Sequence, residues 1–181
     1  MNIIKTKIPG LLIIEPKVFG DSRGFFLETY NGIRYKEHGL DVQFVQDNHS
    51  HSEYGVLRGL HCQRNYPQGK LVSVSRGRVF DVAVDIRKDS PTFGQWESVI
   101  LDDVNHRQFY VPPGLAHGFC VMSQVADFTY KCTDYYHPED EIGIHFSDPD
   151  LNIDWPVDNP KLSDKDRAYP RLKDIAICRA G

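Results

Sequence analysis

The sequence lacks the marks of several common protein classes. Its four cysteines, Cys62, Cys120, Cys132 and Cys178, form no C-x-x-C pair and no spacing typical of a zinc site. No apolar run approaches the length of a membrane span, and no basic segment followed by an apolar core opens the chain. No G-x-G-x-x-G motif follows a predicted strand, so a dinucleotide cofactor is not expected. These absences favour a cytoplasmic protein with no membrane partner, whose cysteines are reduced and mostly buried in strands as free thiols.

A strong excess of charge of either sign is also missing. The chain has 21 Lys and Arg residues against 25 Asp and Glu residues, which gives a net charge of −4. This charge is too small to steer the protein toward nucleic acid, so no nucleic-acid partner is expected. An anionic ligand would have to meet a local cluster of basic side chains.

Strand-like patterns, by contrast, fill most of the chain. Aromatic residues make up 12% of the sequence, and period-two alternation dominates over the 3.6-residue period of amphipathic helices. The strand-like runs are 11–18, 25–29, 44–48, 56–63, 70–75, 78–86, 96–101, 108–111, 119–122 and 127–136. Many short antiparallel strands predict an all-β sandwich or barrel, in a single domain over residues 1–181. Its N- and C-terminal arms could lend a strand or a helix to a second copy.

Local signals add detail to this expectation. Residues 34–38 and the tail from Ser163 onward are the helical candidates, and Gly77 within 73–78 predicts a tight hairpin. Residues 162–166 have the pattern of an N-cap and a first helical turn, which in isolation would be solvated. Arg23 and Glu28 flank two phenylalanines and could form a surface ion pair.

The candidate chemistry centres on His61 and Lys70, which lie on successive predicted strands. A histidine and a lysine held on rigid strands suit proton abstraction beside a carbonyl, one acting as base and the other stabilising an oxyanion. Arg58 and His117 add positive charge nearby, which suits a phosphorylated or enolate-bearing ligand. The alternative for His61 is a hydrogen-bonded core histidine.

His61 and His117 fall in places similar to the two histidine motifs of the cupin superfamily. Metal-binding cupins carry H-x-H and then a glutamate in the first motif. This chain has Gln63 in place of the second histidine and no acid between it and Lys70. Because a lysine at this place repels a divalent cation, no metal site is expected.

Two polar sets could bind a ligand. Tyr130 and Tyr136 would share one face of a strand, so that one phenol could give a proton while the other ring stacks on a base. Two packed tyrosines with satisfied hydroxyls are an equally good interpretation. Gln46 and Asn48, on either side of Asp47, would face a sugar or phosphate from another strand, although exposed edge polarity explains them as well.

Several blocks of the chain, in order, resemble the dTDP-4-dehydrorhamnose 3,5-epimerase family. They are FGDSRGFF at 19–26, FVQDNHS at 44–50, VLRGLH at 56–61, SPTFGQW at 90–96, PGLAHGF at 113–119, YKCTDYY at 130–136 and LSDKD at 162–166. The resemblance runs from about residue 3 to residue 172. It implies a cupin-type jelly roll, a homodimer, and an enzyme with no cofactor and no metal.

The resemblance also implies a substrate and a product. The substrate would be dTDP-4-dehydro-6-deoxy-glucose, epimerised at C3 and C5 to dTDP-4-dehydro-L-rhamnose. This product is an intermediate of dTDP-rhamnose synthesis, which feeds lipopolysaccharide and other cell-surface polysaccharides. Inversion α to a ketone needs a base on one face and a proton donor on the other, together with a cation at the enolate oxygen.

Roles carry over residue by residue from the same motifs. His61 would be the general base and Asp166 its orienting carboxylate. Tyr130 would reprotonate the opposite face, and Lys70 would face the enolate. Tyr136 would stack on the thymine. The remaining nucleotide and sugar contacts would be Arg23, Glu28, Gln46, Asp47, Asn48, Arg58, His117, Glu141 and Lys165, with the arm that carries Arg23 and Glu28 serving the partner's site.

Three alternatives stay open at this stage. The first is a single-carbon epimerase of the same family, because the motif set would also serve one carbon. The second is a non-catalytic cupin that binds nucleotide sugars, against which the joint presence of an acid and a base argues. The third is a metal-dependent cupin oxygenase.

Overall fold

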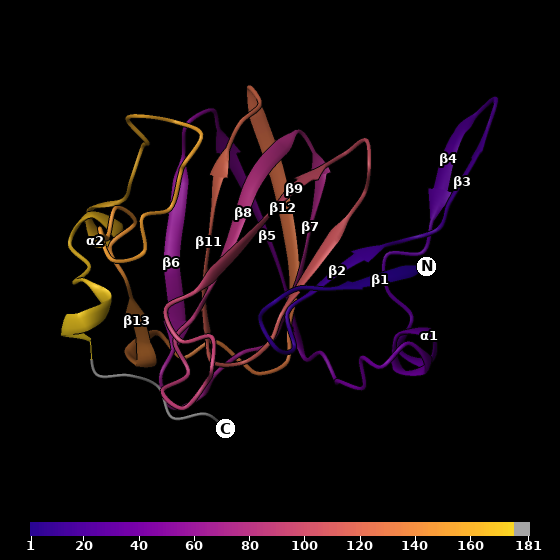
Figure 1. The fold of residues 1–181 in the computed structure, drawn as a ribbon. Coiled ribbons are helices and arrows are strands. Elements are labelled where there is room, and N and C mark those ends of the chain that lie inside the picture. Colours follow the sequence, from indigo (N-terminus) through magenta and orange to yellow (C-terminus); the bar gives the residue numbers. More distant parts are fainter. Residues whose placement is uncertain (176–181) are drawn as a thin grey trace.

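Two antiparallel sheets face each other in the computed structural model, which describes residues 1–175 (Figure 1). The six-stranded sheet has the order β1 (Asn2–Lys5), β2 (Leu12–Glu15), β10 (Gln108–Val111), β7 (Lys70–Arg76), β12 (Val125–Cys132) and β5 (Gln46–Glu53). The five-stranded sheet has the order β13 (Glu141–Gly143), β6 (Leu57–Gln63), β11 (Leu115–Val121), β8 (Arg78–Asp85) and β9 (Trp96–Asp102). The chain passes repeatedly from one sheet to the other, so the predicted antiparallel jelly roll is confirmed.

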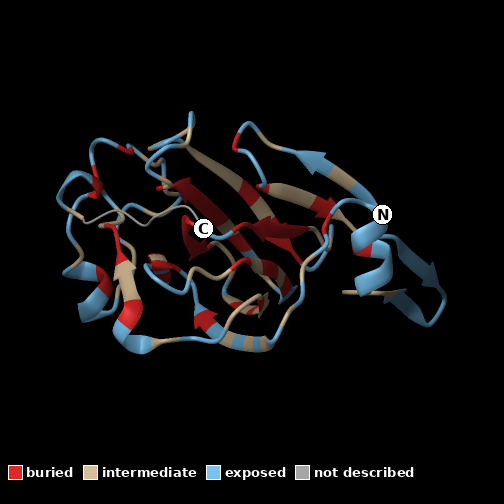
Figure 2. Cartoon of the chain, turned by 90° about the horizontal axis from the view of Figure 1, so that it is seen from below, coloured by how far each residue is buried: buried red, intermediate tan, exposed pale blue. Residues whose placement is uncertain are grey.

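The core lies between the sheets, where alternate strand residues point inward. Phe119 of β11 and Phe128 of β12 stack with their ring centroids 4.1 Å apart, which joins the two sheets. Burying an aromatic ring of this size stabilises the fold by about 1.5–3 kcal/mol. A second apolar cluster, which includes Leu60, Val82 and Leu172, lies where the C-terminal segment packs on the five-stranded sheet. Figure 2 shows the buried residues concentrated on the central strands.

The N-terminal region divides into a paired part and a projecting part. β2 pairs with β10 of the same chain, so β1 and β2 extend the six-stranded sheet. The hairpin of β3 (Val18–Asp21) and β4 (Gly24–Leu27) projects from the sandwich (Figure 1). Its Phe25 and Phe26 are 60% and 69% exposed.

Short helices occur close to where the sequence predicts them. α1 (Gly32–Glu37) begins after the N-cap residue Asn31, and α2 (Asp164–Arg167) begins after Ser163, whose hydroxyl accepts a bond from the Asp166 amide. Two 3-10 turns, η1 (Pro138–Asp140) and η2 (Leu172–Asp174), follow β12 and α2 respectively. No helix within residues 1–175 has the length and apolar character needed to cross a membrane.

Two local predictions are wrong. β7 and β8 belong to different sheets, so Gly77 (φ +84°) turns the chain from one sheet to the other and does not close a hairpin. β12 ends at Cys132, so Tyr136 does not share a strand face with Tyr130.

The cysteines were predicted to be mostly buried free thiols. Cys62, Cys120 and Cys132 are buried, as predicted, and Cys120 and Cys132 are free thiols. Cys178 lies outside the described residues.

Candidate active site

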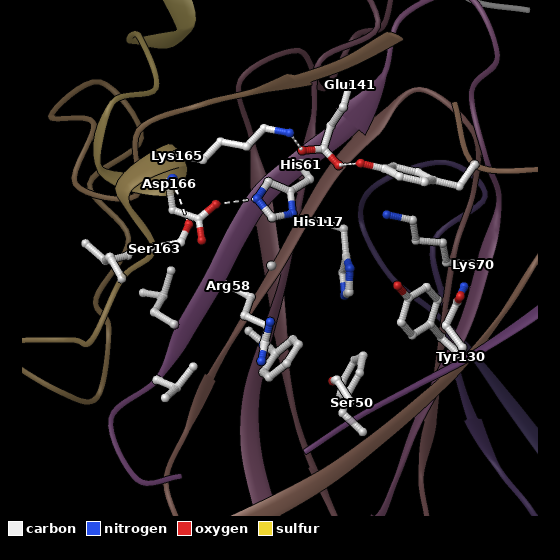
Figure 3. Close-up of a pocket in the computed structure, with 18 of the residues that line it drawn as sticks. Ser50, Arg58, His61, Lys70, His117, Tyr130, Glu141, Ser163, Lys165 and Asp166 are labelled. Atoms are coloured by element: carbon white, nitrogen blue, oxygen red, sulfur yellow. Dashed lines mark hydrogen bonds and ion pairs between the residues drawn. The ribbon is translucent and has the colours of Figure 1, made fainter. Parts of the chain in front are cut away.

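Residues from both sheets line a cavity of about 660 Å³, a size typical of small-molecule sites. β5, β7 and β12 contribute from the six-stranded sheet, while β6, β11 and β13 contribute from the five-stranded sheet, together with residues 161–166 (Figure 3). The cavity brings together most of the predicted site. The predicted residues that line it are Gln46, Asn48, Arg58, His61, Lys70, His117, Tyr130, Tyr136, Glu141, Lys165 and Asp166.

His61 and Asp166 form a hydrogen-bonded pair on one wall. His61 Nε2 lies 2.5 Å from Asp166 Oδ1, although the two residues are 105 positions apart in the chain. Because a carboxylate accepts, neutral His61 carries its proton on Nε2 and leaves Nδ1 as the basic nitrogen. In Figure 3 that second nitrogen points into the cavity. Asp166 is buried in α2, so the expectation of a solvated first turn is wrong for this residue.

A second histidine–aspartate pair lies directly beside the first. His117 is the cross-strand neighbour of His61, and its Nε2 lies 2.8 Å from Oδ1 of Asp81 on β8. Burial raises the pKa of Asp81, and the nearby His117 acts in the opposite direction. Asp81 Oδ2 has no hydrogen-bond partner among the described residues. Asp81 was not among the predicted site residues; its signal in the sequence is a carboxylate flanked by apolar residues within a predicted strand.

Tyr130 and Lys70 occupy the opposite wall, on the six-stranded sheet (Figure 3). Burial is the main cause that raises the pKa of Tyr130, and the neighbouring Cys132 and Glu141 raise it further. The phenol therefore stays protonated at neutral pH and can donate. Lys70 begins β7 beside the end of β12, which places its ammonium group at the same cavity. The site thus presents a base on one sheet and an acid with a cation on the other.

Glu141 gathers three donors at one end of the cavity. It accepts bonds from Lys165 Nζ at 2.6 Å, from the Tyr169 hydroxyl at 2.8 Å and from the Tyr136 hydroxyl at 3.0 Å. Burial would raise the pKa of Glu141, but the Lys165 hydrogen bond and the nearby His61 outweigh it and lower the pKa. Glu141 is therefore ionised and holds Tyr136 in place. Sequence analysis did not identify Tyr169.

The polar residues Gln46 and Asn48 of β5 are half-buried rather than exposed. β5 is the edge strand of its sheet, and Gln46 and Asn48 face the cavity from it. The Gln46 side chain also accepts a bond from the Tyr136 amide at 3.0 Å. Asp47 points to the other face of the strand, where it pairs with Lys131 at 3.0 Å.

Arg23 and Glu28 do not line the cavity of their own chain. The guanidinium of Arg23 pairs with Asp21 at 2.5 Å, and Glu28 pairs with Arg34 at 3.1 Å. The predicted Arg23–Glu28 ion pair is therefore wrong. Both residues lie on or just after the projecting β3–β4 hairpin.

Within residues 1–175, no group of three or more His, Cys, Asp or Glu side chains is arranged to hold a metal ion.

Comparison with known proteins identifies a family for this chain. A model of the family described as dTDP-4-dehydrorhamnose 3,5-epimerase matches residues 5–174. The dTDP-4-dehydrorhamnose 3,5-epimerase of Shigella flexneri is 60% identical, covering 92% of this chain and 93% of its own. The dTDP-6-deoxy-D-glucose-3,5-epimerase of Legionella pneumophila Philadelphia 1, solved with dTDP-4-keto-L-rhamnose, is 58% identical with a TM-score of 0.96, covering 99% and 98% of the two chains.

A more distant solved structure belongs to a different kind of epimerase. A variant of the 3'-monoepimerase ChmJ from Streptomyces bikiniensis, solved with dTDP, is 35% identical with a TM-score of 0.88. It covers 93% of this chain and 86% of its own.

Proposed function

Since this chain belongs to the dTDP-4-dehydrorhamnose 3,5-epimerase family, we propose that it inverts C3 and C5 of dTDP-4-dehydro-6-deoxy-D-glucose to give dTDP-4-dehydro-L-rhamnose. The observation that carries this proposal is the placement of a histidine–aspartate base and a protonated tyrosine on opposite walls of one cavity. The ligand of the Legionella relative, which is named as a 4-keto-L-rhamnose nucleotide, supports the choice of substrate class.

The proposed epimerisation uses groups on both walls of the cavity. His61 Nδ1 removes the proton at C3 or C5, because the C4 ketone acidifies both positions, and Asp166 holds the imidazole in the required tautomer. The electron pair of the broken C–H bond moves to the C4 oxygen, and Lys70 stabilises this enolate. Tyr130 then gives its phenolic proton to the opposite face of the same carbon. Solvent restores the proton to Tyr130 and removes it from His61, so no redox cofactor takes part.

Nucleotide binding occupies the rest of the cavity. Tyr136, held by Glu141, stacks on the thymine, and Arg58 with His117 and Lys165 supplies positive charge for the sugar diphosphate. The protein works as a cytoplasmic homodimer. In it the β3–β4 arm of one copy carries Arg23 and Glu28 to the other copy's cavity, which accounts for the exposed aromatic rings of that arm.

Turnover in deuterated water tests the proposal. The wild type should incorporate deuterium at both C3 and C5 of the product. Tyr130→Phe should lower product formation by about 10²–10⁴-fold, because the second-face donor is gone, while His61 still exchanges substrate protons for deuterons. Tyr54→Phe, an exposed tyrosine outside the cavity, serves as the matched control. A wild-type rate of product formation by the Tyr130→Phe protein would contradict the assignment of Tyr130 as the proton donor.

A single-carbon epimerase is the second candidate, supported by the similarity to the 3'-monoepimerase from Streptomyces bikiniensis. The same deuterium experiment separates the two. Deuterium at only one carbon of the product would establish the single-carbon activity and would exclude epimerisation at both carbons.

A further inference from the structure

Tyr169 lies against the catalytic wall without lining the cavity. Its ring meets the His61 ring edge-on, with centroids 5.6 Å apart and planes inclined by 66°. The same ring lies on the backbone of Gly143, where a Cβ would overlap the Cε2, Cζ and Cδ2 atoms of the tyrosine ring. Gly143 is in turn the cross-strand neighbour of His61. The glycine therefore provides the space in which the ring can sit beside the base.

The hydroxyl group of Tyr169 reaches a second functional residue. It donates to Glu141 Oε1 at 2.8 Å, while the Tyr136 hydroxyl donates to Oε2 of the same carboxylate at 3.0 Å. Burial and the adjacent Glu141 raise the pKa of Tyr169, which keeps the hydroxyl protonated and able to donate. One side chain thus contacts the base with its ring and the carboxylate that holds Tyr136 with its hydroxyl.

The chain around Tyr169 explains why such a contact is needed. Asp166 belongs to α2, a helix of four residues, and a helix this short has little stability of its own. Tyr169 follows Ala168, the C-cap residue of α2, and the next residue, Pro170, accepts a bond from the His145 amide at 2.8 Å. The segment is therefore fixed to the region that follows β13. Fixing Tyr169 fixes the direction in which α2 presents Asp166 to His61.

We propose that Tyr169, seated on Gly143, is a positioning residue that holds the His61–Asp166 pair in its productive geometry. The ring keeps water from one side of the pair and fixes the imidazole plane. Small displacements of a catalytic base are costly, since about 1 Å can lower the rate by about 10²-fold. The activity readouts below rest on the proposed epimerase function, whereas the spectroscopic readout does not.

The first test is a double-mutant cycle. Tyr169→Ala and Gly143→Ala should each lower kcat by about 10–100-fold with KM changed by less than about 3-fold. The double variant should resemble Tyr169→Ala alone, because the new methyl group then fills vacated space. Tyr169→Phe keeps the ring and should retain kcat within about 3-fold while raising KM, since Tyr136 loses part of its support. Gly32→Ala, where the new Cβ meets the Tyr30 hydroxyl and neither residue lines the cavity, is the control.

The second test needs no turnover. Imidazole ¹⁵N NMR of neutral His61 should show the Nε2–H tautomer in the wild type and a tautomer mixture in Tyr169→Ala and Gly143→Ala. Tyr169→Leu, which keeps apolar bulk on Gly143, replaces Tyr169→Ala if thermal melts show that the latter is unfolded. Losses of kcat that add in the double variant, or folded variants with an unchanged His61 tautomer, would overturn the proposal. An inactive wild type with the expected tautomer shifts would contradict only the proposed function.

Discussion

The two histidine–aspartate pairs of this protein are neighbours, yet their surroundings differ. His61 is 27% exposed and takes its carboxylate from α2, a helix outside the sandwich, whereas His117 is 7% exposed and takes its carboxylate from the adjacent core strand. His61 Nδ1 therefore faces the cavity with a short peripheral helix behind it, while the His117–Asp81 pair lies within the wall of the sandwich. A histidine–aspartate hydrogen bond therefore does not by itself make a base. The accessible nitrogen and the origin of the carboxylate decide the role.

The largest difference in kcat between the two pairs is expected when each histidine is replaced. His61→Asn removes the base and should lower kcat by about 10³–10⁴-fold. His117→Asn should act mainly on binding, raising KM and lowering kcat by about 10-fold or less. Steady-state kinetics with thermal melts as a folding check measures both. Equal losses of kcat in the two variants would mean that both histidines move protons, and the distinction drawn above would be lost.

Replacing each aspartate should again lower kcat more in the His61–Asp166 pair than in the His117–Asp81 pair. The losses should be smaller than those of the histidine variants. The amide group of Asp166→Asn can donate to His61 Nε2, which moves the imidazole proton to Nδ1 and blocks the basic nitrogen. We expect kcat to fall by about 10²–10³-fold. Asp81→Asn leaves the His61 nitrogen untouched and should change kcat by less than about 5-fold. A larger loss of kcat for Asp81→Asn than for Asp166→Asn would reverse the assignment of the two pairs.

Some of this comparison was visible in the sequence and some was not. Period-two alternation predicted most strands, and the strand-borne His61 with Lys70 predicted carbonyl chemistry, because both signals are local. Asp81 was missed, since alternation cannot tell an inward carboxylate from an outward one in a strand with apolar residues on both faces. The turn at Gly77 has the same local chemistry whether the next strand pairs with the last one or joins the opposite sheet.

The site residues supplied by the C-terminal segment were the hardest to predict. From its own neighbours Asp166 reads as a solvated first turn, and only the family resemblance assigned it to His61. The contact between Tyr169 and Gly143 has no signal in the local sequence pattern, because contacts between distant segments depend on the tertiary path of the chain. Local periodicity therefore predicts most of the strands, while the residues that orient the base come from long-range packing.

The smallest expected effect is on stability, and it concerns the buried His117–Asp81 pair. Burial raises the pKa of Asp81 above 3.8, its ordinary value, so the folded state holds this proton more tightly than the unfolded state. The stability from that proton is fully present below pH 3.8 and is lost as the pH rises through the folded-state pKa. His117 and Lys70 oppose the shift, which limits its size. Asp81→Asn cannot ionise and avoids the loss.

The melting temperature of Asp81→Asn relative to the wild type should therefore rise between pH 4 and pH 8, by about 2–4 °C for about 1 kcal/mol in a chain of this length. Thermal melts followed by circular dichroism across this range measure the difference, with the exposed Asp158→Asn as control. Parallel curves for Asp81→Asn and wild type would show that the buried carboxylate gains as much from His117 and Lys70 as it loses by burial. The two pairs would then differ in access to the cavity and not in the cost of their charges.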